Sequence, residues 1–260
     1  MTAVGKQAGW LRIVGLGPGD PDHLTVEAAR VLEAATDIVG YSAYVDRVPE
    51  REGQLRHASD NRVEVERATV ALDLALDGRN VAVVSGGDPG IFAMAAAVFE
   101  AIETGNPAWR GLDIEVIPGI SAMQAASARL GAALGHDFCV ISLSDNLKPW
   151  DTLTTRLEAA AGADFVIALY NPASKARPER IFDAFALLRG LKAPETVVVF
   201  ARAVSRFDEA IEITTLGEAD PRKVDMATLV LIGSSATRLI ERGDGRAPWV
   251  LTPRSYGADT

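Results

Sequence analysis

Short apolar runs alternate with longer segments of helical periodicity along the first half of the chain. Because each run is only a few residues long and ends at turn residues, the runs predict buried strands. They are residues 11–14, 37–40, 80–85 and 114–117. Apolar residues at helical spacing predict helices at residues 25–35, 64–77, 91–103 and 122–130. This alternation predicts a mostly parallel sheet with helices on both faces.

The second half of the chain also alternates predicted strands and helices, but the spacing between its strands is different. Its predicted strands are residues 138–143, 165–169, 196–200, 210–215 and 228–232, and its predicted helices are residues 151–161 and 178–190. Only about a dozen residues join the last two strands, which is too few for the usual covering helix, so we expect this sheet to end in antiparallel strands.

The predicted fold class is α/β, with two α/β domains. We expect an N-terminal domain over residues 1–122 and a C-terminal domain over residues 123–240. Residues 241–260 are rich in Gly, Pro and Arg and are expected to form an irregular tail. The chain's 260 residues suffice for two domains of moderate size.

The charge balance is acidic, with 26 Lys and Arg against 35 Asp and Glu. Because the chain lacks a strong positive field, no nucleic-acid partner is expected, although a local basic cluster can still receive an anionic small molecule. Cys139 is the only cysteine, which excludes an internal disulfide and a thiolate metal site, and no bound metal is expected. No apolar run approaches the ~20 residues of a membrane span, so we expect a cytoplasmic protein.

Three Gly-rich turns follow the ends of predicted strands, at residues 15–20, 85–90 and 118–122. In open α/β sheets, ligands bind outside the carboxyl ends of the strands. The first turn, Gly15-x-Gly-x-Gly19, invites a dinucleotide interpretation, but its spacing differs from the dinucleotide fingerprint and Pro18 removes a backbone N–H. The ribose-binding acid expected at the end of the second strand is also missing, since Asp37 lies at its beginning and Gly40 at its end. A tight turn without a ligand is the alternative.

The other two turns carry polar side chains. Asp88 could accept hydrogen bonds from ribose hydroxyls or an amine, or it could merely cap the helix expected to begin at Ile91. Ser121 could be an ordinary N-cap residue or a ligand contact, and the two roles are compatible.

Taken together, these turns resemble the tetrapyrrole methyltransferase superfamily over residues 11–240. The motifs are Val14-Gly-x-Gly-Pro-Gly-Asp20 followed by Leu24-Thr25, then Gly86-Gly-Asp-Pro89, then Pro118-Gly-Ile-Ser-Ala122. Further segments are similar to its precorrin-3B C17-methyltransferase branch: residues 40–45, 136–145, 147–150, 169–178 and 213–216. Ala201-Arg-Ala-Val204 departs from an Arg-Asn-Ala-Gly-like turn of many relatives, which puts in doubt which side chain reaches the ligand there.

The resemblance implies an active-site cleft between the two domains, bound S-adenosylmethionine (SAM), and a homodimer. It implies methylation at C17 of precorrin-3B with ring contraction to precorrin-4, in cobalamin biosynthesis. The implied SAM contacts are Pro18, Gly86, Gly87, Asp88, Ile91, Ser121, Ala122, Tyr170, Ala203, Met226 and Thr228. Gly17 and Asp20 would face the tetrapyrrole.

The macrocycle's own electron-rich carbon makes a side-chain nucleophile unnecessary, but ring contraction requires a proton to leave a hydroxyl. Candidates for this transfer are His136 and Asp145, with Asp20 and Asp88 behind them. His136 could equally be a structural residue at a strand entrance, and Asp145 could cap the helix near Trp150. Lys175, Arg177 and Arg180 are expected to hold substrate carboxylates, or else to form a solvated loop.

Several alternatives stay open. Within the superfamily they are another precorrin methyltransferase, a diphthamide-pathway enzyme and a ribosomal RNA methylase. An NAD(P)-dependent oxidoreductase is the enzyme of another class, and it would need the phosphate-binding turn and ribose reader that this sequence lacks. A non-catalytic tetrapyrrole-binding protein would not explain three turns suited to ligands.

Overall fold

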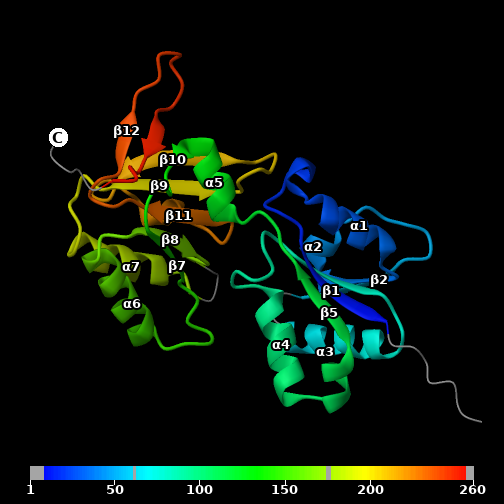
Figure 1. Ribbon diagram of the computed structural model, residues 1–260. Helices are drawn as coiled ribbons and strands as arrows, with labels where there is room; N and C mark the ends of the chain where they lie inside the picture. Colours follow the sequence, from blue (N-terminus) through cyan, green and yellow to red (C-terminus); the bar gives the residue numbers. More distant parts are fainter. Residues whose placement is uncertain (1–8, 61–62, 174–176, 256–260) are drawn as a thin grey trace, which may run out of the picture. The chain divides into compact units, whose positions relative to one another are not determined.

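The computed structural model describes residues 9–60, 63–173 and 177–255. The chain divides into two compact units, Met1–Ser121 and Ala122–Thr260, and each is built from helices around a five-stranded β-sheet (Figure 1). The α/β class predicted from the sequence is confirmed.

The sheet of the first unit is fully parallel, with strand order β3-β2-β4-β1-β5. All its strands therefore end at one edge, and the three Gly-rich turns leave that edge after β1, β4 and β5. The edge strand β3 escaped prediction because its sequence, Leu55-Arg-His-Ala-Ser59, is polar and partly exposed. The strands are β1 (Trp10–Gly15), β2 (Asp37–Tyr41), β3 (Leu55–Ser59), β4 (Val81–Ser85) and β5 (Asp113–Ile117).

Helices cover both faces of this sheet (Figure 1). Successive side chains of a strand point to opposite faces, so Val81 and Val83 of β4 join the core under α3 and α4, whereas Ala82 and Val84 join the core under α1 and α2. Thr25 caps α1 as predicted, accepting from the N–H of Ala28 at 3.1 Å. The helices are α1 (Val26–Ala34), α2 (Ser42–Val45), α3 (Glu64–Leu76) and α4 (Met94–Thr104), with 3-10 turns η1 (Pro21–His23) and η2 (Pro107–Gly111).

The sheet of the second unit is mixed, with strand order β10-β9-β11-β8-β7. Only β7 and β8 pair in parallel; β11 lies between β8 and β9 and runs against both, and β10 runs against β9. Antiparallel pairing thus reaches further into this sheet than the sequence predicted. The strands are β7 (Phe138–Ser142), β8 (Val166–Tyr170), β9 (Val197–Arg202), β10 (Ala210–Thr215) and β11 (Thr228–Ile232).

One face of this sheet packs on α6 (Trp150–Gly162) and α7 (Arg180–Arg189), around the buried ring of Phe185. In Figure 1, α5 (Ala122–Leu130) lies on the opposite face. η3 (Pro221–Lys223) precedes β11.

A small sheet adds β12 (Arg238–Ile240), β13 (Trp249–Leu251) and β6 (Gly131–Ala132) to the second unit. The segment expected to be an irregular tail therefore contains a strand. β13 pairs with β6, more than a hundred residues earlier in the chain, and such long-range pairing leaves no local pattern to read.

Candidate functional site

The three Gly-rich turns of the first unit pack against one another, backbone to backbone. A Cβ added at Gly119 would lie 2.3 Å from the carbonyl oxygen of Gly87, and one added at Gly15 would lie 2.7 Å from the amide nitrogen of Gly119. Gly17 and Gly87 also exchange two backbone hydrogen bonds, of 3.2 and 2.9 Å. The mutual approach of the turns therefore requires glycine at positions 15 and 119.

Asp88 fastens the second turn to the third. Its Oδ1 accepts a hydrogen bond from the N–H of Gly90 at 2.8 Å, and its Oδ2 accepts one from the N–H of Gly119 at 3.0 Å. The helix that follows begins at Met94 with Ala93 as N-cap residue, so Asp88 does not cap it. Each carboxylate oxygen retains acceptor capacity for a ligand.

Two backbone N–H groups of the first turn are used within the unit. Leu16 donates to the carbonyl oxygen of Ser85 at 2.8 Å, Gly17 donates to Gly87, and Pro18 has no N–H. Arg47 occupies the carbonyl oxygens of the same turn: its Nη2 donates hydrogen bonds to the carbonyl oxygens of Leu16 and Gly17 at 2.7 and 3.0 Å. Because a phosphate cradle needs N–H groups aimed at the ligand, this geometry argues against dinucleotide binding.

The backbone of the second turn stays accessible on one side. Gly87 has a φ of +69°, and a Cβ added there would have no neighbour nearer than 3.8 Å. Gly86, in contrast, lies against the ring of Tyr44, 2.7 Å from its added Cβ. A ligand can therefore approach the backbone at Gly87, which suits the predicted SAM contact.

The remaining predicted residues of the first unit lie on the same edge. Pro18 and Ser121 are buried, and Ile91 is partly exposed. Asp20 is partly exposed at the end of the first turn, where its Oδ1 accepts from the N–H of Asp22 at 3.0 Å and caps η1.

In the second unit, the strand register gathers several predicted contacts at one edge. Ser142 at the end of β7 pairs with Tyr170 at the end of β8, and Thr228 at the start of β11 pairs with Arg202 at the end of β9. Because β11 runs against its neighbours, its beginning lies beside their ends. This edge carries Tyr170, Ala203, Met226 and Thr228.

Tyr170 joins the end of β8 to the start of α5. Its hydroxyl accepts a hydrogen bond from the N–H of Met123 at 2.9 Å. Asn171 then turns the chain with a φ of +50°, which asparagine tolerates, and its Nδ2 donates to Ser142 Oγ at 2.9 Å. These bonds fix the loops at the predicted SAM contact.

The turn after β9 has an unusual backbone. Ala203 and Ser205 have φ values of +49° and +66°, a region that side chains other than glycine rarely occupy. The buried Ser205 hydroxyl has no hydrogen-bond partner among the described residues. Strained backbone and unsatisfied buried groups concentrate at functional sites, so this turn has the properties expected of a ligand contact.

An ion-pair network ties this turn to the loop before β11. Arg202 donates from Nε to Asp225 at 2.9 Å and from Nη1 to Asp208 at 2.9 Å, and Thr228 donates its hydroxyl to Asp225 at 2.7 Å. Burial alone would raise the pKa of Asp225, but the hydrogen bonds from Thr228 and Arg202 hold that pKa below its usual value. Met226, 47% exposed, projects from this loop.

Asp145 lies between two arginines. Its Oδ2 accepts from Arg180 Nε at 2.7 Å, and Arg177 Nη1 lies 3.4 Å from its Oδ1. Although burial acts to raise it, the bond from Arg180 and the charges of both arginines hold the pKa of Asp145 below its usual value. Asp145 does not cap the next helix, whose N-cap residue is Pro149. An ionised, paired carboxylate is poorly suited to proton transfer near neutral pH.

His136 lies at the other end of its strand. It immediately precedes Asp137 and the start of β7, whereas Asp145 lies beyond the opposite end of β7, where Tyr170 ends the parallel strand β8. Its Nε2 is 2.8 Å from Ser234 Oγ, and its Nδ1 is 3.1 Å from the carbonyl oxygen of Asp137. The structure thus places the two candidates for proton transfer at opposite ends of β7 and favours the structural alternative for His136.

Some expectations fall elsewhere. Lys175 lies outside the described residues, and Arg180 stacks on the Trp150 ring at 4.7 Å besides pairing with Asp145. Cys139 is partly buried in β7, where burial raises the pKa of its thiol.

Across residues 9–60, 63–173 and 177–255 there is no group of three or more His, Cys, Asp or Glu arranged to hold a metal. In the same part of the chain, no helix is long and apolar enough to cross a membrane.

Sequence reasoning missed Arg47, Arg202 and Asp225, which hold the turns in place. The positions of two of them gave a partial signal, because Arg202 ends β9 and Asp225 lies just before β11, at the edge that carries predicted SAM contacts. Nothing in the sequence indicated that Arg47 reaches the carbonyl groups of the first turn, about thirty residues earlier.

Comparisons with known proteins agree with this geometry. Residues 11–220 match the family described as Tetrapyrrole (Corrin/Porphyrin) Methylases. A Sinorhizobium protein named precorrin-3B C(17)-methyltransferase is 54% identical over 248 residues, which cover 95% of this chain and 97% of that protein. A Salmonella typhimurium protein named probable cobalt-factor III C(17)-methyltransferase is 41% identical over 249 residues, covering 95% and 99%.

A solved structure extends the likeness to three dimensions. The crystal structure of the methyltransferase CobJ has 51% sequence identity and a TM-score of 0.90, and the match covers 95% of this chain and 100% of that one. The chain therefore belongs to the tetrapyrrole (corrin/porphyrin) methylase family, whose enzymes are SAM-dependent methyltransferases.

Proposed function

We propose that this protein transfers the methyl group of SAM to C17 of precorrin-3B and contracts the macrocycle to precorrin-4, in cobalamin biosynthesis. The observation that carries the proposal is the 54% identity with a protein named for C17 methylation of precorrin-3B, extending over nearly all of both chains. Each of the two sheet edges described above carries groups that suit SAM or a tetrapyrrole.

The residues at these edges fit SAM, which supplies a methyl group on a positively charged sulfur when bound. In the first unit, the open side of Gly87 admits close approach, and Asp88 has acceptor capacity for ribose hydroxyls or the amino group. In the second unit, the Ser205 hydroxyl needs a partner that a polar ligand can provide.

The protein's main task is positioning. The attacked carbon belongs to an electron-rich ring, so the reaction needs alignment and exclusion of water, and no side-chain nucleophile is required. The packed glycine turns hold one set of contacts, and the network of Arg202, Asp225 and Thr228 holds the other.

We assign the proton transfer of ring contraction to Asp20. His136 lies at the far end of its strand, Asp145 is paired with two arginines, and Asp88 binds two backbone N–H groups. Asp20 is partly exposed beyond the first turn, and its carboxylate accepts one N–H within η1. It is therefore the best placed of the four to accept a proton from a substrate hydroxyl.

Exposed apolar side chains at the edge of the second unit suit a flat macrocycle. Leu147 is 92% exposed and Phe207 is fully exposed, and they lie on the loops after β7 and β9. Met226 lies just before the start of β11. Large exposed apolar groups that gather on one edge indicate an apolar partner. Arg177 contributes part of the grip on substrate carboxylates, although Asp145 balances much of its charge.

The proposal includes a homodimer as the working form and the cytoplasm as its location. Light scattering of the purified protein tests the first, and cell fractionation tests the second. A monomer with full activity would overturn the homodimer.

The decisive experiment incubates the protein with SAM and precorrin-3B and follows product mass, absorbance and S-adenosylhomocysteine (SAH). We expect one SAH for each tetrapyrrole consumed and a ring-contracted product with one added methyl group. Tetrapyrrole that remains unchanged while a known methyltransferase converts it in parallel would overturn the proposal.

A cobalt-containing substrate is the second candidate, because the Salmonella typhimurium relative is named for cobalt-factor III. The higher identity of the Sinorhizobium relative favours the metal-free substrate. Measurement of kcat/KM for both substrates side by side decides between them.

A further inference from the structure

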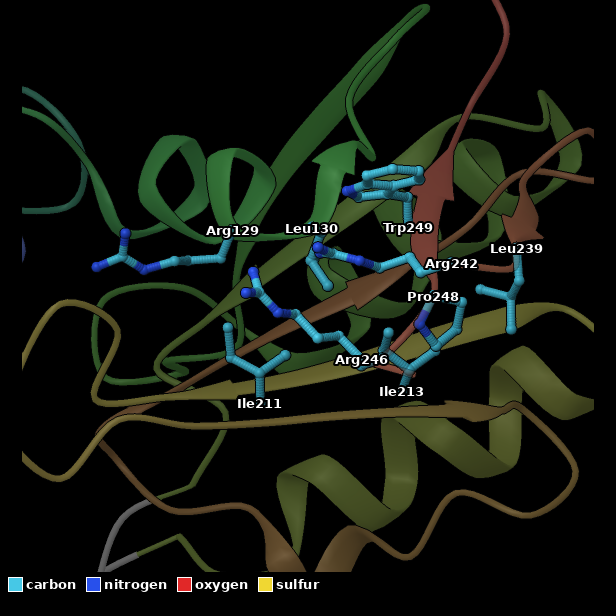
Figure 2. Close-up of a pocket in the computed structure, with 10 residues that line it drawn as sticks. Arg129, Leu130, Ile211, Ile213, Leu239, Arg242, Arg246, Pro248 and Trp249 are labelled. Carbon is cyan, nitrogen blue, oxygen red and sulfur yellow. The ribbon is translucent and has the colours of Figure 1, made fainter. Parts of the chain in front are cut away.

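The second unit has a pocket of about 330 Å³ that the proposed reaction does not use (Figure 2). It lies over the face of β10, between the end of α5 and the segment around β12 and β13. Ile213 on its floor pairs with Val199 in the middle of β9, so the pocket extends over the face of the sheet and away from the strand ends. Its lining is Arg129, Leu130, Ile211, Ile213, Leu239, Arg242, Arg246, Ala247, Pro248 and Trp249.

The pocket has an apolar floor and one aromatic wall. Figure 2 shows Ile211 and Ile213 below and Trp249 above, with Arg242 and Arg246 between them. Trp249 is 44% exposed, although it packs against the backbone at Gly131. A flat apolar group placed between these walls would cover surface that now contacts water.

The charge of the pocket is positive. Arg242 binds Asp244 through two hydrogen bonds, of 3.0 and 2.6 Å, and its guanidinium lies 4.7 Å from the centre of the Trp249 ring. Arg246 lies 3.5 Å from the same carboxylate, so two guanidinium groups share one negative charge. Arg129 points away from them in Figure 2. Its Nε lies 3.3 Å from Oε2 of Glu209, which balances its charge.

None of the ten lining residues is acidic, although the chain as a whole carries a net charge of −9. Arg242 is preorganised by Asp244 and Trp249, whereas the Arg246 side chain is 75% exposed and can turn towards a ligand. Guanidinium groups bind carboxylates with directed pairs of hydrogen bonds. The pocket therefore combines a slot for a flat ring with an anchor for a carboxylate.

We propose that this pocket binds the carboxylate-bearing edge of a tetrapyrrole, as a second tetrapyrrole site apart from the reacting one. One ring would lie over Ile211 and Ile213 beside Trp249, and its acidic side chain would reach Arg246 and Arg242. The pocket's volume is at the small end of ligand sites, so it receives one edge of the macrocycle and leaves the remainder in solvent. The choice of ligand rests on the proposed function.

The test uses the full chain with saturating SAH and uroporphyrin III, a stable carboxylated tetrapyrrole, followed by calorimetry and by quenching of tryptophan fluorescence. We expect Arg246→Gln to weaken one porphyrin site about tenfold, the usual order for a lost charge-assisted hydrogen bond. The variant Trp249→Phe should remove the quenching that accompanies this site. Arg222→Gln is the matched control, since Arg222 is 80% exposed and pairs with Asp220 in another part of the unit.

Three results would overturn the proposal. The first is equal porphyrin affinity in Arg246→Gln and Arg222→Gln, and the second is tighter binding of the one-ring acid trimesate than of uroporphyrin. The third is a change in the molar mass of the Arg246→Gln protein in solution without a change in its porphyrin binding. The last would make the pocket an interface between copies of the chain. This test measures porphyrin binding and no methyl transfer. Its outcome can therefore be interpreted even if the protein does not methylate precorrin-3B, and a negative outcome here does not contradict the proposed methylation.

Discussion

The backbone N–H of Gly119 donates a 3.0 Å hydrogen bond to Oδ2 of Asp88 and so joins the turn after β5 to the turn after β4. The same carboxylate holds Gly90 within its own turn. A residue predicted as a SAM contact therefore also fixes the shape of the surface that SAM would meet. Substitutions at Asp88 will mix a binding effect with a structural one, and the two can be separated.

Asp88→Asn keeps the shape of the side chain but can accept only one of the two backbone hydrogen bonds. We expect the free energy of unfolding to fall by about 1 kcal/mol and the Kd for SAH to rise about tenfold. Chemical denaturation and calorimetric titration measure the two effects. Reduced stability with unchanged SAH affinity would restrict Asp88 to a structural role.

Gly119→Ala should destabilise the first unit, because the new methyl group would lie 2.3 Å from the carbonyl oxygen of Gly87. We expect a loss of about 2–3 kcal/mol in the free energy of unfolding. Gly111→Ala is the control, since a Cβ at Gly111 meets nothing within 4 Å. Equal stability of the two variants would contradict the close packing of the turns.

Asp20→Asn and His136→Gln test the assignment of proton transfer. Loss of the carboxylate at Asp20 should lower kcat about a hundredfold, the range for general acid–base catalysis. His136→Gln should leave kcat within about twofold and cost about 1 kcal/mol of stability, because it disturbs the bond to Ser234. Steady-state kinetics and thermal unfolding of both variants decide, and the reverse pattern of kcat values would return the role to His136.

Phe207→Ser should raise the KM for the tetrapyrrole about tenfold. The Phe207 ring is fully exposed and is proposed to cover the macrocycle, so its removal takes away apolar contact with the substrate. SAH affinity should not change. Val26→Ser, at a 75% exposed position on α1, provides the control. Should Phe207→Ser show wild-type KM, the apolar edge of the second unit does not contact substrate.

Asp37 makes stability depend on pH. It is fully buried, accepting from Arg79 Nε and Thr36 Oγ1 at 2.6 Å each and lying 2.8 Å from His57 Nε2. Burial acts to raise the pKa of Asp37, but these bonds hold it below the ordinary value of 3.8. The stabilisation is therefore complete above the unfolded pKa and is lost as pH falls through the lower folded pKa.

Asp37→Asn should accordingly be less stable than the wild type by about 2 kcal/mol at neutral pH, and the gap should narrow below about pH 4. Urea denaturation from pH 7 to pH 3 measures it. A constant difference across this range would show that charge is not the source of the stabilisation.

Local pattern was sufficient for the buried strands. The first four residues of β4 are all apolar, and they alternate between the cores on the two faces of the sheet. An unbroken apolar run of this kind predicts a strand that is covered on both faces. β3 and β13 escaped prediction, because β3 is a polar edge strand and β13 is a three-residue strand whose pairing with β6 is long-range. The start of α4 was misplaced by three residues, since Phe92 adopts a φ of +51° that no propensity rule anticipates.

The site could be predicted as far as its turns, because glycine and proline mark strand ends in the sequence. Which polar residue lies near which could not be predicted. His136 and Asp145 are close in sequence, but a strand lies between them and sets them at its opposite ends. The pairing of Asp145 with Arg177 and Arg180 joins residues more than thirty positions apart, so no local pattern predicts it.

The position of β11 between β8 and β9 bears on how the protein folds during synthesis. The first unit has all its strands once Ile117 has left the ribosome. The second sheet cannot be completed until residues 228–232 emerge, because β11 joins the β7–β8 pair to the β9–β10 pair. Until then, β8 and β9 each have an unpaired edge. Nascent chains that stop short of Thr228 should therefore carry a finished first unit and an aggregation-prone second one.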